Sequence, residues 1–231
     1  MTASSFFAGA VVSLLVGLDR TACAQFMLAR PIVAAPLVGL FLGDPLVGLK
    51  IGALLELLWL GKLPVGAAVP PDDTQVAIGA TVLVIALAPM LGGAEGSGLL
   101  LLVLLVAMPL GKVGQYFDRL ARHGNARLLL RAEEALERED LVTVERCHRR
   151  GLLHFAAAAV ATYLLIVLAG KGLLPLLYPL YGGLLGDVSG WVQLIFFLVG
   201  SAAIVGTLNV SRAMTLFAAS FASALLLFWL R

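Results

Sequence analysis

The chain of 231 residues carries little charge, three histidines and only two cysteines. Charged residues make up 13% of the sequence, against about 25% in typical soluble domains. Cys23 and Cys147 lie far apart and neither has a partner at metal-ligand spacing, so we predict neither a disulfide framework nor a metal site. His123, His148 and His154 include no pair at the helical spacing of a zinc site, and we interpret them as loop or interface residues.

The sequence also lacks the glycine-rich loops that bind nucleotide phosphates. It contains neither GxxxxGK[ST] nor a GxGxxG that follows a strand, which disfavours ATP-driven pumping by this chain alone. It offers no histidine in a catalytic setting. We therefore expect no catalytic residue, no metal and no cofactor in this chain.

Hydrophobic residues, in contrast, make up 61% of the chain, and its mean hydropathy is +1.01. A bilayer core needs about 20 apolar residues per helix. Apolar stretches lie at 3–18, 76–91, 99–111, 151–169, 191–208 and 213–230, and several of them are too short to cross a bilayer alone. These features predict an all-α integral membrane protein in contact with the lipid bilayer.

One segment, residues 112–150, holds nine of the 16 Lys and Arg residues and seven of the 14 Asp and Glu residues. Its amphipathic stripe predicts one or two water-exposed helices. Its basic excess beside membrane segments predicts a cytoplasmic location, which labelling of Cys147 would report. Acidic residues interleaved with the basic ones argue against a nucleic-acid-binding surface. The stripe consists of Leu128, Leu129, Leu136, Leu141 and Val144.

This cytoplasmic amphipathic helical segment separates an N-terminal membrane half, 1–111, from a C-terminal membrane half, 151–231. The run PIVAAPLVGLFLG, residues 31–43, is apolar but only about two-thirds of spanning length. Glycine and proline also interrupt residues 47–71, VGLKIGALLELLWLGKLPVGAAVPP. Irregular backbone at membrane depth is tolerated only inside protein or beside a water-filled cavity. We therefore predict that both runs form re-entrant or broken helical hairpins, which transporters place around a substrate.

Glu56 lies within one of these apolar runs, where a carboxylate costs roughly 2.5 to 3.5 kcal/mol on insertion scales. An ionisable group at such a position indicates function by default. Lys50 and Lys62 each lie six residues away, which is a poor helical spacing for a direct ion pair. We therefore favour a substrate-binding role for Glu56, and a structural ion pair stays the alternative.

Asp72 and Asp73 follow two prolines and precede the apolar run that begins at Val76, which is the pattern of a helix start. Their simplest role is N-capping. A capping aspartate at membrane depth can also accept hydrogen bonds from sugar hydroxyl groups, and Trp59 can offer an aromatic face. The predicted substrate-binding residues are Glu56, Trp59, Asp72 and Asp73.

Arg30 before Pro31 and Asp44 before Pro45 bracket the short apolar run. Each either marks the water-exposed end of that run or pairs with an opposite charge nearby, and both interpretations stay open. We expect structural or gating roles for Arg30, Gly43, Asp44 and Gly66.

The order of residues 29–74, ARPIVAAPLVGLFLGDPLVGLKIGALLELLWLGKLPVGAAVPPDDT, closely resembles the signature of a known family. That family is the membrane IIC component of the mannose/fructose/sorbose branch of the bacterial phosphotransferase system. By position, Glu56 corresponds to the family's L-E motif and Asp72 to its P-D motif. Arg30, Gly43 and Asp44 match its RP and LGD elements. The resemblance continues through AMPLGKVGQ, residues 107–115.

The resemblance implies a sugar-translocating subunit in the bacterial plasma membrane, working in an oligomeric complex with a second membrane subunit, IID, and with cytoplasmic IIA and IIB. In such systems a phosphohistidine of IIB donates its phosphoryl group to the sugar, which links uptake to phosphorylation. Two alternatives stay open: a membrane scaffold or regulatory relative without transport activity, and an ion-coupled transporter that works alone. The cost of Glu56 and Asp72 in apolar surroundings favours transport over the scaffold.

Overall fold

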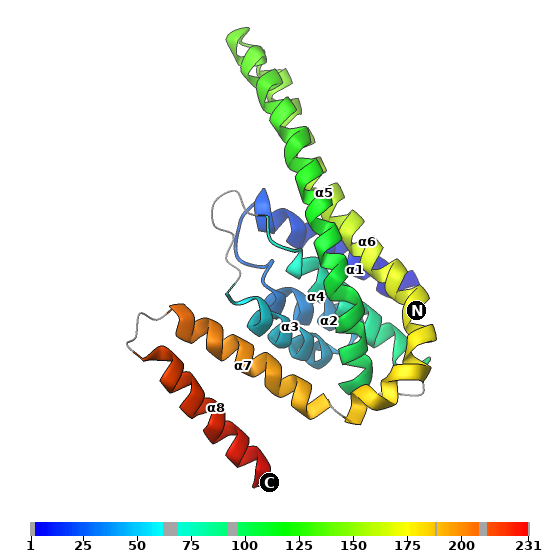
Figure 1. Ribbon diagram of the computed structural model, residues 1–231. Coiled ribbons are helices and arrows are strands. Elements are labelled where there is room, and N and C mark those ends of the chain that lie inside the picture. The colour runs from blue at the N-terminus through cyan, green and yellow to red at the C-terminus, as the bar shows by residue number, and fades with distance from the viewer. Residues whose placement is uncertain (1–2, 62–68, 92–96, 188, 208–211, 231) are drawn as a thin grey trace.

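A computed structural model describes residues 3–61, 69–91, 97–187, 189–207 and 212–230, so Lys62 and Gly66 lie outside the described residues. The described secondary structure is entirely helical, which confirms the all-α prediction (Figure 1). The helices are α1 (Ala3–Thr21), α2 (Pro31–Leu42), α3 (Pro45–Trp59), α4 (Asp73–Leu87), α5 (Ser97–Glu137), α6 (Leu141–Asp187), α7 (Ser189–Thr207) and α8 (Ala213–Trp229).

Two of these helices are long and apolar enough to cross a membrane: Gly98–Glu137 within α5 and Leu141–Asp187, which is α6. Among the shorter apolar helices, α2 has 12 residues and α4 has 15. At 1.5 Å per residue, α2 is only about 18 Å long, against the ~30 Å of a bilayer core. The short helices therefore need the protein around them to satisfy their ends.

The helices α2 and α3 form a short hairpin whose turn follows from the sequence LGDP. Gly43 adopts the left-handed conformation, with φ of 87°, and the N–H of Asp44 donates to the Gly39 carbonyl at 2.9 Å, which closes α2. Asp44 then caps α3 by accepting from the N–H of Val47 at 3.0 Å, and Pro45 occupies the first helical position. Residues 31–43 thus form one arm of a hairpin and end at the turn, and the re-entrant placement of this hairpin in a membrane stays a prediction.

Glycine at two positions of α3 allows the two arms to touch through their backbones. A Cβ atom at Gly48 would lie 2.3 Å from the carbonyl oxygen of Ala35, and one at Gly52 would lie 2.5 Å from that of Pro31. Real Cβ atoms essentially never approach other atoms so closely. Gly48 and Gly52, two of the glycines that interrupt residues 47–71 in the sequence, therefore serve close packing between α2 and α3.

Helix α4 forms the centre of the helical body and packs against α1, α2, α3, α5 and α6. Its residues Val76 to Val84 are buried on every face, which explains why this segment is apolar without an amphipathic period. Tyr163 of α6, also fully buried, donates from its hydroxyl to the Phe6 carbonyl of α1 at 2.9 Å. This contact ties the first helix to the sixth.

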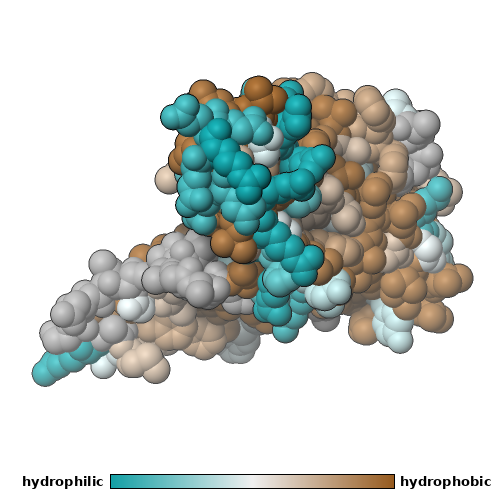
Figure 2. Space-filling view, turned by 90° about the horizontal axis from the view of Figure 1, so that it is seen from above, coloured by the Kyte–Doolittle hydropathy of each residue, from teal (hydrophilic) through white to brown (hydrophobic). Residues whose placement is uncertain are grey.

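The charged segment 112–150 forms the projecting ends of α5 and α6, which pair as a long hairpin (Figure 1). Seen from above, hydrophilic residues gather over this hairpin, whereas much of the remaining surface is hydrophobic (Figure 2). The boundaries at 112 and 150 fall inside continuous helices, so the segment is an extension of two membrane-body helices. Its cytoplasmic location stays a prediction.

The amphipathic stripe does not form the contact between the two helices, because Leu129, Leu136 and Leu141 are exposed. The two helices instead bury Ala135 and Cys147, small side chains that let the helix axes approach. Burial of Cys147 also makes it a poor labelling site, contrary to the sequence-based expectation.

At the other end of the chain, α7 packs mainly on α3, and α8 contacts α7 (Figure 1). The rings of Trp191 and Phe228 pack with their centroids 4.3 Å apart, joining the two helices. Many hydrophobic side chains of this pair are exposed, including Phe197 and Leu227. Such apolar surfaces fit a lipid or protein environment.

Candidate substrate site

A cavity of about 830 Å³ opens where the ends of α1, α2, α3 and α4 meet the middle of α5. Five of the residues singled out in the sequence line it, although they come from α3, from the first turn of α4 and from the cap residues just before α2 and α4. The charged residues around it are Asp19, Arg20, Arg30, Glu56, Asp72, Asp73, Asp118 and Arg122. The five predicted residues are Arg30, Glu56, Trp59, Asp72 and Asp73.

Gly43 and Asp44 are not among the residues that line the cavity. They lie at the turn between α2 and α3, where Gly43 ends one helix and Asp44 begins the next. Their positions fit the structural role expected for them and offer no contact with a substrate in this cavity.

The first turn of α4 forms one wall of the cavity. Asp72 caps the helix: its Oδ1 accepts from the N–H of Gln75 at 3.1 Å, which confirms the capping role expected from the sequence. Its own N–H donates to the Gly111 carbonyl of α5 at 3.0 Å, so the start of α4 is fixed against α5. Thr74 adds a third connection, from its hydroxyl to the Ala29 carbonyl at 2.6 Å.

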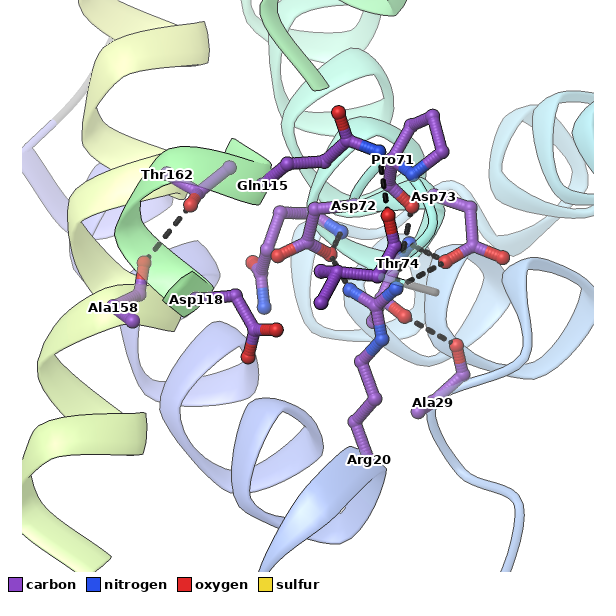
Figure 3. A network of polar contacts seen from close by, with 12 residues as sticks. Arg20, Ala29, Pro71, Asp72, Asp73, Thr74, Gln115, Asp118, Ala158 and Thr162 are labelled. Carbon is purple, nitrogen blue, oxygen red and sulfur yellow. Dashed lines mark hydrogen bonds and ion pairs between the residues drawn. The ribbon is translucent and has the colours of Figure 1, made fainter. Parts of the chain in front are cut away.

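Arg20, in the last turn of α1, reaches across to the start of α4 (Figure 3). Its Nη1 lies 2.5 Å from Asp72 Oδ1, and its Nη2 lies 3.3 Å from Asp73 Oδ1. Nη2 also donates to the Pro71 carbonyl at 3.2 Å. One guanidinium group therefore holds three consecutive residues, Pro71, Asp72 and Asp73, at the start of α4.

Glu56 has a protein partner that the sequence reasoning about Lys50 and Lys62 did not identify. Its Oε1 forms an ion pair with Nη2 of Arg30, and its Oε2 accepts from the N–H of Ile32 at 3.4 Å. Ile32 lies in the first turn of α2, where backbone N–H groups lack helical partners. Glu56 therefore fastens α3 to the start of α2, so the structural alternative for this residue is realised with a different cation.

Helix α5 supplies the cavity wall at the base of the projecting hairpin. Asp118 pairs with Arg122 one turn later, with Oδ2 and Nε 2.8 Å apart. Gln115 donates from its side chain to the Val69 carbonyl at 2.7 Å and so holds the loop before α4. Asp19, 5% exposed, accepts from the N–H groups of Phe26 and Leu28 and shapes the loop after α1.

Sequence reasoning missed Arg20, Asp118 and Arg122 as cavity residues. Arg20 offered the clearest signal, because it ends the first apolar stretch in the order GLDR, beside an aspartate. Asp118 and Arg122 are hidden in the charged segment, where nothing in the sequence distinguishes them from solvent-exposed charges. Among the described residues, no group of three or more His, Cys, Asp or Glu side chains is placed to hold a metal ion.

Residues 5–228 match the family described as the PTS system sorbose-specific IIC component. The chain belongs to this family. Relatives in the IIC family include the mannose-specific EIIC component of Escherichia coli strain K12, 32% identical over 148 residues. The sorbose-specific EIIC component of Lacticaseibacillus casei is 27% identical over 202 residues, which cover 85% of this chain and 68% of that protein.

The match to the Escherichia coli protein covers 64% of this chain and 52% of the relative, so the chain spans about half the length of that relative. The fold is also similar to solved structures. One, described as "Structure of membrane protein", has a TM-score of 0.73 over 97% of this chain and 87% of the other at 24% identity. The mannose transporter ManYZ, solved with microcin E492, gives a TM-score of 0.62 at the same identity and coverage. The chain therefore has the fold of a membrane transporter.

Proposed function

We propose that this IIC chain is the sugar-translocating subunit of a mannose-type phosphotransferase system. In this proposal it lies as a multi-pass protein in the bacterial plasma membrane, beside a IID subunit. A phosphohistidine of IIB, recharged by IIA, phosphorylates the sugar that the membrane subunits bind. The mannose-, sorbose- and fructose-named relatives suggest a hexose, either an aldose or a ketose.

The cavity is the observation that carries this proposal. It gathers Glu56, Trp59, Asp72 and Asp73 from separate parts of the signature region, and its volume of about 830 Å³ lies within the range of small-molecule sites. Carboxylate oxygens accept hydrogen bonds from hydroxyl groups, and an indole offers an apolar face for a sugar ring. The site thus combines the two kinds of contact that a neutral polyol requires.

The position of the cavity supports coupling to a cytoplasmic phosphocarrier. Gly114, Gln115 and Asp118 bring α5 to the cavity, within the charged segment that the positive-inside rule assigns to the cytoplasm. A sugar bound there lies beside the base of the α5–α6 hairpin. It is then close to the side of the membrane on which IIB works.

Within this site the two aspartates are better placed than Glu56 to contact the sugar. Both oxygens of Glu56 are used by Arg30 and by the N–H of Ile32. We assign Glu56 and Arg30 to the frame of the cavity wall, and Asp72 and Asp73 to hydrogen bonds with sugar hydroxyls. Trp59 supplies the apolar face.

The test is sugar binding by the chain co-purified with its IID partner, using radiolabelled D-mannose, D-fructose and L-sorbose. Asp72→Asn keeps a residue that caps helices well but removes the charged acceptor. We expect at least about tenfold weaker binding, because hydrogen bonds to charged groups contribute roughly 1.5–3 kcal/mol.

The matched control is Asp44→Asn, the same substitution at a helix cap outside the cavity, which should leave affinity unchanged. The proposal is wrong if the intact complex binds none of the three sugars. It is also wrong if Asp72→Asn binds them as tightly as the natural protein does.

A further inference from the structure

We infer that Arg20 is a positioning residue for this site: its guanidinium group orients Asp72 and Asp73 so that each presents its second carboxylate oxygen to the sugar. The inference rests on the proposed function, in which the two aspartates bind sugar hydroxyls. Arg20 itself contacts the protein and acts through its neighbours.

The contacts of Arg20 fix the relative orientation of the two carboxylates. Its Nη1 approaches Asp72 Oδ1 at 2.5 Å and its Nη2 approaches Asp73 Oδ1 at 3.3 Å, while the Pro71 carbonyl accepts from Nη2 at 3.2 Å (Figure 3). A guanidinium group is planar and its donors form a rigid fork. Three contacts to one such group leave the two aspartates little freedom to rotate independently.

These contacts and the backbone all use the same oxygen of each aspartate. Asp72 Oδ1 also accepts from the N–H of Gln75 at 3.1 Å, and Asp73 Oδ1 accepts from the N–H of Thr74 at 3.0 Å. None of these contacts between described residues uses the Oδ2 atom of either aspartate. A carboxylate oxygen carries two lone pairs, so the two Oδ2 atoms form a fixed pair of acceptors for two hydroxyl groups.

Charge gives a second reason for the arrangement. Asp72 and Asp73 are neighbours in sequence, and their side chains are 11% and 31% exposed. Two carboxylates so close together repel each other, and the positive charge of Arg20 offsets this repulsion. Loss of the guanidinium group should therefore disturb both acceptors at once.

Arg20→Lys is the decisive variant, because it keeps a positive charge in the last turn of α1 but loses the planar fork. A lysine ammonium has a single nitrogen, so it cannot offer the two carboxylates separate nitrogens at a fixed spacing, as Nη1 and Nη2 of Arg20 do. We expect folded yield and melting temperature near those of the natural complex, with affinity for the bound sugar lowered about tenfold. Arg149→Lys, in an exposed pair with Glu145 outside the cavity, is the matched control and should change neither quantity.

A second measurement separates positioning from a merely structural role. Arg20→Gln is combined with Asp72→Asn and Asp73→Asn, and affinity is measured on folded, IID-associated protein. If Arg20 acts through the aspartates, its loss changes affinity less than about twofold once both carboxylates are gone, because coupled residues are not additive. In the natural background the same loss should weaken binding at least tenfold.

The inference is overturned if folded Arg20→Lys and Arg20→Gln complexes bind sugar like the natural complex while Asp72→Asn weakens binding. That outcome would leave the proposed function intact and make Arg20 a structural residue. If the aspartate variants also bind normally, or the natural complex binds no sugar, the proposed function itself fails. The two failures are therefore distinguishable in one set of measurements.

Discussion

Two helical hairpins of this protein, α2–α3 and α5–α6, use the same turn chemistry in different surroundings. In each, a residue with positive φ ends the first arm: Gly43 at 87° and Glu139 at 58°. In each, the next residue is an aspartate that caps the second arm. Asp44 accepts from the N–H three residues later at 3.0 Å, and Asp140 does so at 3.1 Å.

What differs is how the arms pack. The arms of α2–α3 touch through backbone at Gly48 and Gly52, and this hairpin is part of the helical body. The projecting ends of α5–α6 bury little beyond small residues such as Ala135, and leave leucines and charges exposed. Turn signals therefore predict that a hairpin forms, whereas the composition of its arms predicts where it lies.

The largest expected effect tests whether the α5–α6 hairpin lies in the cytoplasm, because the difference in surroundings between the two hairpins depends on that location. Because Cys147 is buried, we would place a single thiol at the exposed turn, Glu139→Cys, in a Cys23→Ser, Cys147→Ala background. A membrane-impermeant maleimide should label this variant fully in permeabilised cells and not at all in intact cells. Labelling in intact cells would contradict the assigned orientation, and the cysteine-free background controls for non-specific reaction.

Local sequence signals predicted the all-helical class and the helix start at Asp72. Asp72 was predicted as a helix cap from Pro-Pro-Asp-Asp before an apolar run, and the structure confirms it. The run 31–43 was predicted to be a re-entrant or broken element; residues 31–42 form one short helix that ends at Gly43, and its re-entrant placement in a membrane stays a prediction. These features depend on residues within a few positions of one another, so the sequence alone specifies them.

Partners that are distant in sequence could not be predicted in the same way. Glu56 pairs with Arg30 because the α2–α3 turn folds the chain back on itself, while sequence spacing suggested only the lysines near Glu56. Arg20 lies 52 positions before Asp72 and reaches it because α1 ends beside the start of α4. The exposed Leu129 and Leu136 show a further limit, since helical period alone does not say which face a partner helix covers.

Among changes in stability, the largest should come from the close contact between the α2 and α3 arms. Gly48→Ala would place a methyl group 2.3 Å from the Ala35 carbonyl oxygen, so the arms must separate. Overpacking of this kind typically costs about 1–3 kcal/mol, and we expect a lower melting temperature and folded yield in detergent. Gly172→Ala is the control: nothing lies within 4 Å of its added Cβ, and it should stabilise α6 slightly. Equal melting temperatures for the two variants would contradict the close contact between Gly48 and the Ala35 carbonyl.

A smaller change in stability is expected from substitutions at the positive-φ residues of the α2–α3 and α5–α6 turns. Gly43 has nothing within 4 Å of an added Cβ, so Gly43→Ala tests the cost of the left-handed backbone alone, about 1–2 kcal/mol. At the equivalent position of the other hairpin, Glu139→Gly removes that cost and should slow hydrogen exchange around the turn. The expected effects are opposite in sign. If Glu139→Gly destabilises its turn, the side chain of Glu139 contributes something that its backbone conformation does not explain.

The smallest effect concerns the cap at the water-exposed turn. Hydrogen bonds from the hydroxyl and the N–H of Thr143 lower the pKa of the Asp140 carboxyl in the folded protein below its usual 3.8. A lowered folded pKa means that the cap contributes fully above pH 3.8 and is lost as the pH falls through the folded value. Hydrogen exchange at residues 141–146, corrected for the intrinsic pH dependence, should therefore accelerate below about pH 4. Asp140→Asn keeps an acceptor that does not titrate, so its protection should stay level over the same range. If hydrogen exchange depends on pH in the same way in the natural protein and in Asp140→Asn, groups other than Asp140 control the opening of this turn.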